Sequence, residues 1–398
     1  MTKSSGSGLV FLSAKRTPFG AFGGGLKDVN PSDLGASCAK AALEQAKIGA
    51  DQVEHVIVGN VLQSTGDAIC VARHIGLKAG VPIEIAALGV NRLCGSGFQV
   101  LVEAQHQMWA EDAKVCLVGG VENMSLTPYV LRNARWGNRM GHAPVEDYLT
   151  AALTDTYCSC SMAMTAENLG EKYGITRAQA DEFALSSQMR AKAAQEAGAF
   201  ADEISPYSIT DKKGTTVRFE KDEHPKPATT LEALAKLKAG FKQNGLVTAG
   251  NASGIVDGAS MMVVSTEEYA RKNNLKPLGR LVSYGIAGVE PHIMGIGPAP
   301  AARQALKRAG LSLSQMDLVE VNEAFAAQYL SVEKELELDR EITNVNGGAI
   351  AIGHPLAASG TRITAHLLYE LRRRKKRYAL GSACIGGGQG IAVIVEAL

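Results

Sequence analysis

The sequence is poor in aromatic residues, nearly free of net charge and without a long apolar run. Phe, Trp and Tyr make up 5% of its 398 residues, and 41 Lys and Arg against 40 Asp and Glu leave a formal net charge of +1. So balanced a chain lacks the excess basic charge typical of nucleic-acid binders, and we expect no nucleic-acid partner. No apolar run approaches the roughly 20 residues of a membrane-crossing helix, so we expect no membrane span.

Phosphate-binding signatures are missing as well. Neither G-x-x-x-x-G-K-[ST] nor G-x-G-x-x-G occurs, so we predict neither a nucleotide phosphate loop nor a dinucleotide site. One run, Arg372–Arg377, holds six consecutive basic residues. We interpret it as the solvated C-terminal end of a helix, where cations complement the helix dipole; a polyanion site is the alternative.

Seven cysteines are scattered along the chain, and none form a C-x-x-C pair. This pattern predicts neither a disulfide framework nor a zinc site and is typical of a reducing compartment. Cys158 and Cys160 lie close together, but no histidine is near them, so we expect no metal. Cys38, Cys70 and Cys116 lie in apolar stretches and are predicted to pack in the core.

The first eight residues, Met1–Gly8, contain no apolar stretch, so we expect no secretory leader. Together with the cysteine pattern, this predicts a cytoplasmic protein of bacterial type. The mitochondrial matrix is the alternative compartment.

The sequence does contain an internal duplication. Glu54–Gly59 matches Asp317–Asn322, Ala42-Leu43 matches Ala305-Leu306, and Ser96-Gly97 matches Ser359-Gly360, always 263 positions apart. Because all three matches share one register, the chain should contain two halves of similar structure. With 46% apolar residues, both halves can form a large core.

Each half alternates helix and strand, which predicts an α/β unit with helices on both faces of a mixed sheet. Helices are predicted over 31–46, 98–110, 300–309 and 363–374, and strands over 53–58, 115–118, 318–321 and 378–380. A polar segment with helices at 178–197 and 231–237 interrupts the repeat. We predict a first half over 1–121, completed by 251–275, an inserted loop domain over 122–250, and a second half over 276–398.

The most distinctive residues are Cys94 and Cys384, each set among glycines almost a full chain apart. Cys94 precedes a predicted helix, whose dipole and free N–H groups would favour a nucleophilic thiolate. Cys384 precedes Gly386-Gly387-Gly388, where backbone amides can form an oxyanion site. The alternatives are a buried packing cysteine for the first and a plain glycine-rich turn for the second.

Two further polar residues fit the same chemistry. His354, between Gly353 and Pro355, occupies the place in the second half that matches the Cys94 region, just ahead of a helix predicted to start near Ser359. It is a candidate base for the thiol, or else a turn histidine bonded to backbone. Asn322 ends a predicted strand, a common active-site position in α/β sheets, or else caps the next helix.

These residues make the chain resemble the thiolase family over nearly its whole length. The motifs that carry the resemblance are Asn91–Gly97, 247–254, Asn322–Phe325, 347–360 and Cys384–Gly390. The likeness is greatest to mitochondrial-type 3-ketoacyl-CoA thiolases, and bacterial acetyl-CoA acetyltransferases are also similar. The resemblance implies a duplicated five-layered α-β-α-β-α fold with an inserted loop domain that binds CoA.

The resemblance also implies roles for the site residues. Cys94 would take the acyl group of a 3-ketoacyl-CoA, His354 would activate Cys94 and later the CoA thiol, and Cys384 would protonate the leaving acetyl-CoA enolate. Asn322, through a water, and His354 would form one oxyanion hole, and the N–H groups of Cys94 and Gly386 the other. By position, the CoA contacts are Ser253, Ala249, Phe241 and Lys226, and the acyl pocket is lined by Met162, Met294 and Phe325. Coenzyme A would be a substrate, and no cofactor is expected.

Two positions depart from the family pattern. Ser161 stands where many acetoacetyl-type thiolases have histidine, which favours the broader 3-ketoacyl specificity over an acetyl-CoA acetyltransferase. Ala357 stands where glycine is usual, and its methyl group is expected either to narrow the site or to shift His354.

Besides a thiolase, two other functions are compatible with the same fold. One is a related condensing enzyme, which Cys384 argues against, and the second is a non-catalytic acyl-CoA or lipid carrier. For the assembly, we expect a homo-oligomer, a dimer or a tetramer, with the 125–148 region as a tetramer contact.

Overall fold

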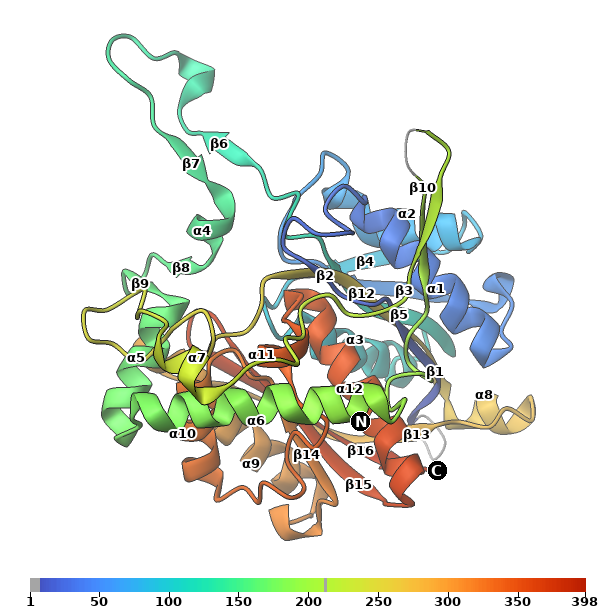
Figure 1. Ribbon diagram of the computed structural model, residues 1–398. Coiled ribbons are helices and arrows are strands. Elements are labelled where there is room, and N and C mark those ends of the chain that lie inside the picture. The colour runs from blue at the N-terminus through green and yellow to red at the C-terminus, as the bar shows by residue number, and fades with distance from the viewer. Residues whose placement is uncertain (1–7, 211–212) are drawn as a thin grey trace.

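The structure, a computed structural model, describes residues 8–210 and 213–398 (Figure 1). The expectation about a secretory leader concerns residues 1–8, and of these only Gly8 lies in the described part of the chain. Strands of both halves join one sheet in the order β14-β15-β16-β13-β1-β12-β5-β3-β4. The first half supplies β1 (Leu9–Arg16), β3 (His55–Gly59), β4 (Ala87–Val90), β5 (Val115–Glu122) and β12 (Val256–Thr266). The second half supplies β13 (Gly279–Gly288), β14 (Leu318–Val321), β15 (Tyr378–Ile385) and β16 (Gln389–Ala397).

The two halves share one topology, as the duplication predicts. In the first, β3 pairs parallel with β5, which pairs antiparallel with β12; in the second, β14 pairs parallel with β15, which pairs antiparallel with β16. Where β4 extends the first half, a single parallel bridge from Val319 to Thr343 extends the second. The halves meet through the short β1–β13 pairing.

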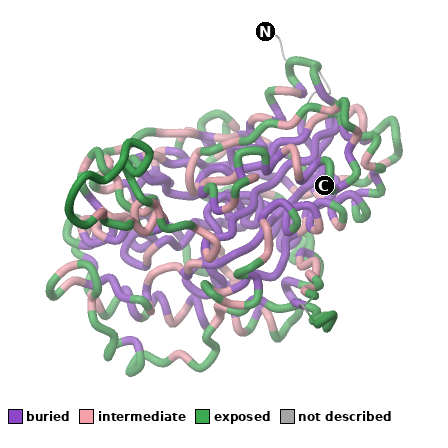
Figure 2. Tube along the Cα trace, turned by 90° about the horizontal axis from the view of Figure 1, so that it is seen from above, coloured by how far each residue is buried: buried purple, intermediate pink, exposed green. Residues whose placement is uncertain are grey.

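Helices add three layers to the two half-sheets. α1 (Pro31–Ala46) and α2 (Val71–Ala79) cover the first half-sheet, and α9 (Pro298–Ala309) covers the second. Between the half-sheets lie α3 (Ser96–Trp109) and α12 (Leu356–Arg374), and α12 contacts strands of both. The predicted five-layered α/β architecture is confirmed, and its most buried part is this middle layer and the strands beside it (Figure 2).

The repeated Ser-Gly pairs lie where α3 and α12 cross. A Cβ atom on Gly97 would lie 2.6 Å from the carbonyl oxygen of Ala357, and one on Gly360 would lie 2.2 Å from the backbone nitrogen of Phe98. Only glycine permits such close backbone approach. The crossing therefore brings the start of each helix, with Cys94 on one side and His354 on the other, to the centre of the molecule.

Some predictions about local structure were wrong. The strands predicted over 115–118 and 378–380 continue to Glu122 and Ile385, as β5 and β15. The helix predicted over 363–374, with a start near Ser359, begins at Leu356, because Leu356-Ala357-Ala358 are good helix formers directly after Pro355. Cys70 is exposed, because it ends a short 3-10 turn at the surface, whereas Cys38 and Cys116 are buried as predicted. The basic run after Glu370 behaves as a solvated helix end, with Arg373 and Arg374 paired to that carboxylate.

The segment between β5 and β12 packs mainly on the second half. α5 (Met162–Tyr173) and α6 (Arg177–Glu196) lie against α10 (Ala326–Leu336), where the Phe183 ring stacks on Tyr329 at 4.0 Å. α7 (Leu231–Ala235) and α11 (Ala349–Ile352) pack on α6. The remaining elements are β2 (Gly20–Ala21), α4 (Tyr148–Ala152), β8 (Thr154–Asp155), β9 (Cys160–Ser161), β10 (Tyr207–Thr210), β11 (Thr216–Phe219), α8 (Glu267–Lys272) and the 3-10 turns η1 (Ala50–Gln52), η2 (Ala68–Cys70), η4 (Pro291–Ile296) and η5 (Leu313–Gln315).

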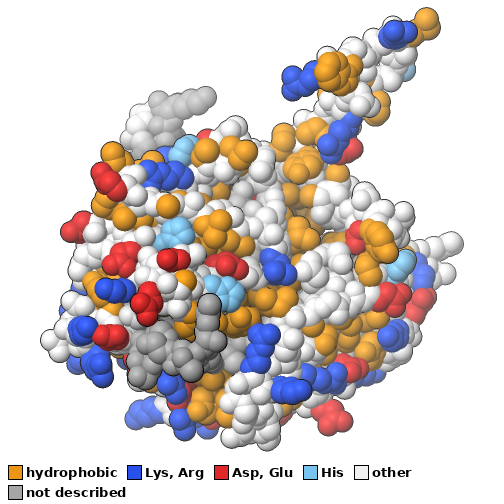
Figure 3. Space-filling view, turned by 180° about the vertical axis from the view of Figure 1, so that it is seen from behind, with side chains coloured by type: hydrophobic (Ala, Val, Ile, Leu, Met, Phe, Trp, Pro, Cys, Tyr) orange, Lys and Arg blue, Asp and Glu red, His pale blue; other side chains and the backbone are white. Residues whose placement is uncertain are grey.

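A two-stranded arm leaves the body of the molecule. It contains β6 (Tyr129–Leu131), η3 (Ala134–Trp136) and β7 (Val145–Asp147), and it projects well beyond the other elements (Figures 1 and 3). Trp136 is 86% exposed and Met140 is 96% exposed. Among the described residues, no helix has the length and apolar character needed to cross a membrane.

Candidate active site

Cys94 lies in a rigid turn between β4 and α3. Leu93, just before it, adopts a left-handed backbone with φ of 47°, and Ser96 locks the turn by accepting the N–H of Arg92 at 2.9 Å and donating to the carbonyl of Leu93 at 2.7 Å. A non-glycine residue in this conformation is uncommon and requires such support. The turn holds the thiol half-buried at the N-terminal end of α3, as predicted.

The charge state of Cys94 differs from the prediction. Burial raises the pKa of its thiol to about 11, although the N–H groups of Gly386 and of Cys94 itself face the sulfur and lower the pKa. Loss of hydration therefore opposes the thiolate that the helix dipole and the N–H groups were expected to favour. The nucleophile rests as a thiol and needs a base.

His354 has the properties of that base. Burial, followed by the charge of Arg362, lowers the pKa of its imidazole to about 3, so the ring is neutral at physiological pH. Its Nδ1 lies 2.6 Å from Ser359 Oγ, and its Nε2 lies 3.4 Å from Asn322 Nδ2. With the Asn322 amide oriented in this way, Nδ1 carries the proton and donates to Ser359 Oγ, and the unprotonated Nε2 accepts from Asn322 Nδ2.

Asn322 follows β14 directly and points into the same site. Its backbone N–H donates to the carbonyl of Ser382 at 2.9 Å, and its buried Oδ1 has no hydrogen-bond partner among the described residues. α10 begins only at Ala326 after Phe325, so the alternative that Asn322 caps this helix is wrong. A buried acceptor left without a partner marks a position where a ligand or a water would fit.

Cys384 lies on β15 and is buried with the residues predicted to line the acyl pocket. It forms one apolar cluster with Met294, Ala324, Met162 and Phe325. Burial and the neighbouring Cys94 raise the pKa of its thiol far above the ordinary value, so it holds its proton. A Cβ atom on Gly386 would lie 3.3 Å from both the Met162 sulfur and Leu93, so there is little space for a side chain at this position.

Of the predicted CoA contacts, Ser253 lies beside this site. Ser253 donates its N–H to the carbonyl of Ala324 at 2.9 Å, which places the 247–254 segment beside Asn322–Phe325. Lys226, Phe241 and Ala249 are exposed on the segment inserted between β5 and β12. Their contact with CoA stays a prediction.

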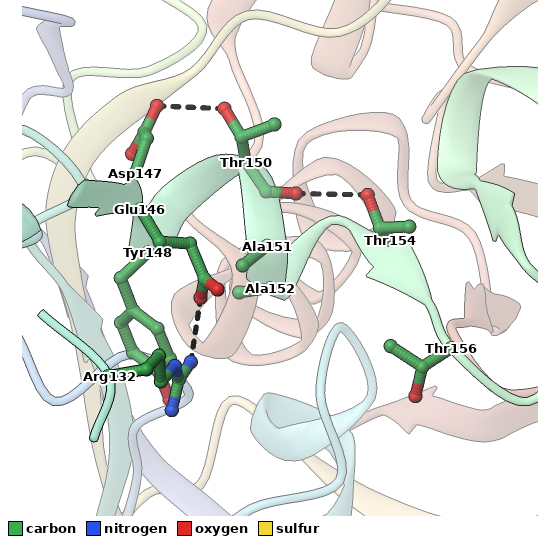
Figure 4. Close-up of a pocket in the computed structure, with 9 residues that line it drawn as sticks. All are labelled: Arg132, Glu146, Asp147, Tyr148, Thr150, Ala151, Ala152, Thr154 and Thr156. Atoms are coloured by element: carbon green, nitrogen blue, oxygen red, sulfur yellow. Dashed lines mark hydrogen bonds and ion pairs between the residues drawn. The ribbon is translucent and has the colours of Figure 1, made fainter. Parts of the chain in front are cut away.

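A separate hollow of about 650 Å³ lies at the base of the arm (Figure 4). None of the predicted site residues lines it. Its residues are Arg132, Glu146, Asp147, Tyr148, Thr150, Ala151, Ala152, Thr154 and Thr156. Arg132 pairs with Glu146 at 2.7 Å inside it. Within the described part of the chain, no group of three or more His, Cys, Asp and Glu side chains could hold a metal ion.

Sequence reasoning missed Glu122. This buried carboxylate, the last residue of β5, accepts hydrogen bonds from Asn60 Nδ2 and from the N–H groups of Val61, Leu62 and Ala357. An acidic residue that ends an otherwise apolar strand was the signal, but the predicted boundary after residue 121 assigns Glu122 to the loop domain.

The two departures from the family pattern have local explanations. Ser161 caps α5 by accepting the N–H of Met164 at 3.3 Å. Ala357 is buried, and its methyl group faces Gly59, at whose position a Cβ atom would lie 3.4 Å away. His354 keeps its contacts to Ser359 and Asn322 beside this methyl group.

A protonated nucleophilic thiol, a neutral imidazole, a second buried thiol and paired backbone N–H groups define a site for covalent acyl transfer through cysteine. Family models agree: the thiolase N-terminal domain matches residues 9–268, and the thiolase C-terminal domain matches residues 275–397. The chain belongs to the thiolase family.

Individual relatives are close over their full length. The chain is 55% identical to human mitochondrial 3-ketoacyl-CoA thiolase over 390 residues, 98% of each protein. The crystal structure of that human thiolase in complex with CoA matches with a TM-score of 0.95 over 98% of each chain. The acetyl-CoA acetyltransferase of Bacillus anthracis matches with a TM-score of 0.96 and 45% identity over 98% of this chain and 99% of that one.

Proposed function

We propose that this protein cleaves 3-ketoacyl-CoA with free CoA, releasing acetyl-CoA and an acyl-CoA shortened by two carbons. The observation that carries this proposal is the union of Cys94, neutral His354 and Cys384 beside an apolar cluster that contains Met162, Met294 and Phe325. These apolar side chains suit contact with an alkyl chain, and the three polar groups suit a reaction that forms a thioester and releases a carbanion.

In the first half-reaction, His354 Nε2 takes the proton of Cys94, and the sulfur attacks the C3 carbonyl of the substrate. The N–H groups of Cys94 and Gly386, which already face the sulfur, hold the resulting oxyanion. The C2–C3 bond then breaks. The acyl group stays on Cys94, and Cys384 gives its proton to C2 of the leaving acetyl-CoA enolate. Imidazolium His354 and a water on Asn322 hold the enolate oxygen.

After acetyl-CoA leaves, the proton on His354 passes to the Cys384 thiolate, which makes both groups neutral again. In the second half-reaction, His354 takes the proton of a CoA thiol, and that sulfur attacks the acyl group on Cys94. The bond to Cys94 breaks, and the Cys94 thiolate regains a proton from His354. Ser253, Ala249, Phe241 and Lys226 hold the CoA along the inserted loop domain. The exposure of Ala249, Phe241 and Lys226 supports this assignment, as does the likeness to the human thiolase solved with CoA. No cofactor takes part.

The reverse reaction, condensation of two acetyl-CoA molecules, is the second candidate, and the likeness to the acetyl-CoA acetyltransferase favours it. Ser161, whose hydroxyl group is used to cap α5, argues for the broader 3-ketoacyl specificity. A non-catalytic carrier has no use for Cys94, His354, Asn322 and Cys384 in one buried cluster.

We further propose that the protein is a homo-oligomer, a dimer or a tetramer, in which the arm contacts another copy. The exposed Trp136 and Met140 support this, because large apolar side chains are rarely left in water without a partner. The mitochondrial relatives favour the mitochondrial matrix over the bacterial cytoplasm. Fractionation of the source cells checks the compartment.

The direct test is CoA-dependent thiolysis of acetoacetyl-CoA beside a medium-chain 3-ketoacyl-CoA, with Cys94→Ala as the control. We expect faster cleavage of the longer substrate and a loss of at least about a thousandfold in the variant, because the covalent step is removed. Cleavage of acetoacetyl-CoA alone would support the acetyltransferase instead. No cleavage of either by folded protein that binds CoA would overturn the enzyme proposal.

A further inference from the structure

Glu122 is a buried carboxylate that the proposed reaction does not use. All four of its hydrogen-bond partners are N–H donors: Oε1 accepts from Asn60 Nδ2 at 3.0 Å and from Leu62 at 2.9 Å, and Oε2 accepts from Val61 and Ala357, each at 3.2 Å. A carboxylate accepts hydrogen bonds only, whereas a carboxylic acid would turn an O–H toward a donor. The site is therefore built for the ionised form, although burial raises its pKa to about 8.

The internal duplication relates the hydrogen bond between Glu122 and Ala357 to the active site. Ala357 lies 263 positions after Cys94, so its N–H is the counterpart of the Cys94 N–H that faces the reactive sulfur. Each N–H stands at the start of a middle-layer helix, α3 in one half and α12 in the other. In the first half this N–H is open to an acyl oxyanion. In the second half Glu122 Oε2 occupies the corresponding place and accepts the N–H of Ala357.

The same carboxylate joins two walls of the active site. Ala357 is three residues after His354, in a turn where Leu356 and Ala358 donate to the carbonyls of His354 and Pro355 at 2.9 Å and 2.7 Å. On the other side, Val61 packs in one apolar cluster with Cys94 and Leu356. Glu122 thus bonds to the turn that carries the base and to the loop that packs against the nucleophile.

We infer that Glu122 is a positioning residue: it fills the unused oxyanion site of the second half and thereby fixes His354 relative to Cys94. This inference rests on the proposed function, because its kinetic consequence is the rate of the first proton transfer. A misplacement of about 1 Å between base and nucleophile costs on the order of a hundredfold in rate.

The test is Glu122→Gln, which keeps the shape of the side chain but turns an NH₂ group toward N–H donors. We expect kcat for thiolysis to fall about ten- to a hundredfold with an unchanged KM for CoA. Glu122→Asp, which keeps the charge, should recover part of the loss in kcat. Asn60→Ala removes one donor, so its kcat should lie between those of the wild type and Glu122→Gln. The matched control is Asp317→Asn, since Asp317 also accepts two backbone N–H groups, those of Arg377 and Tyr378, far from the site.

Two further measurements separate this role from a purely electrostatic one. The negative charge of Glu122 raises the pKa of Cys94, so a purely electrostatic role predicts faster alkylation of Cys94 and no fall in kcat for Glu122→Gln. Amide hydrogen exchange over residues 354–360 should speed up in Glu122→Gln and not in Asp317→Asn. This readout needs no turnover, so it tests the inference even if the wild type proves inactive. Unchanged exchange and unchanged kcat, or an equal loss of kcat in Asp317→Asn, would overturn it.

Discussion

At the scale of single residues, the site pairs a nucleophile that keeps its proton with a base that lacks one. Burial raises the pKa of Cys94 to about 11 and lowers that of His354 to about 3, so both groups are neutral near pH 7. A neutral pair avoids the desolvation cost of a buried thiolate–imidazolium pair in the resting enzyme.

This charge state predicts how Cys94 reacts with a thiol reagent. Below its pKa, the thiolate fraction increases about tenfold for each pH unit. We expect the rate of Cys94 alkylation by iodoacetamide to rise without a plateau from pH 6 to pH 9. The measurement is mass spectrometry of the tryptic peptide 93–114, in which Cys94 is the reactive residue and Cys116 is absent. A plateau near pH 7 would show that the thiolate is already formed and that the pKa is depressed.

At the scale of elements, the arm built on β6 and β7 carries none of the residues predicted for the acyl-transfer site. Its exposed Trp136 and Met140 gain burial only by contact with another molecule. We predict that Trp136→Ser combined with Met140→Ser lowers the mass of the assembly in sedimentation velocity, from tetramer to dimer if the wild type is a tetramer. Val217→Ser, a 60% exposed residue on the separate β10–β11 hairpin, serves as the control. A wild-type monomer, or an unchanged mass in the double variant, would contradict the prediction.

The middle-layer helices show how elements create the site. α3 and α12 can cross closely because Gly97 and Gly360 have no side chain at the contact. The N-terminal ends of the two helices therefore lie together. The loop that carries Cys94, from the first half, faces the loop that carries His354, from the second. A site made from two copies of one unit explains why its residues are almost a full chain apart.

At the scale of the whole molecule, a buried ionic network ties three parts of the chain together. Arg16 of β1 pairs with Glu203 and Asp222 of the inserted segment, each at 2.7 Å, and Glu203 pairs with His366 of α12 at 2.9 Å. Burial opposes ionisation of Glu203, but the charges of His366 and Arg16 outweigh it and lower the pKa of this carboxyl to about 2. The same contact with Glu203 overcomes burial and raises the pKa of His366.

Glu203→Gln should therefore destabilise the protein by about 3–5 kcal/mol at pH 7, because it leaves His366 buried without a carboxylate and leaves Arg16 with Asp222 alone. The contribution of Glu203 is present above the ordinary pKa of 4.5 and is lost as the pH falls through about 2, so the difference from wild type should shrink over that range. Urea unfolding of both proteins at several pH values measures this difference in the free energy of unfolding. Glu268→Gln, which removes an exposed ion pair with Lys272, should leave stability unchanged. A constant difference from pH 7 to pH 2 would contradict the assignment.

Much of this protein was predictable from local pattern. Helical and alternating apolar spacing, and one register held over 263 positions, predicted two α/β halves, because these signals depend only on near neighbours and on repetition. Glycine-flanked Cys94, His354 and Cys384 indicated the chemistry, since few uses besides catalysis require those residue types in such loops. The family resemblance then assigned the acyl-pocket residues, and the fold brings Met162, Met294 and Phe325 around Cys384.

Tertiary structure alone decided the quantities that depend on burial and on distant partners. A pattern at Cys94 suggested a thiolate, but the pKa of a thiol is set by how much water surrounds it, and that follows from the packing of residues far away in the chain. In the sequence, Glu122 begins a polar segment; only the fold places the N–H of Ala357, 235 positions later, against its carboxylate. Sequence determines which groups are present; only the folded chain determines which of them share an environment without water.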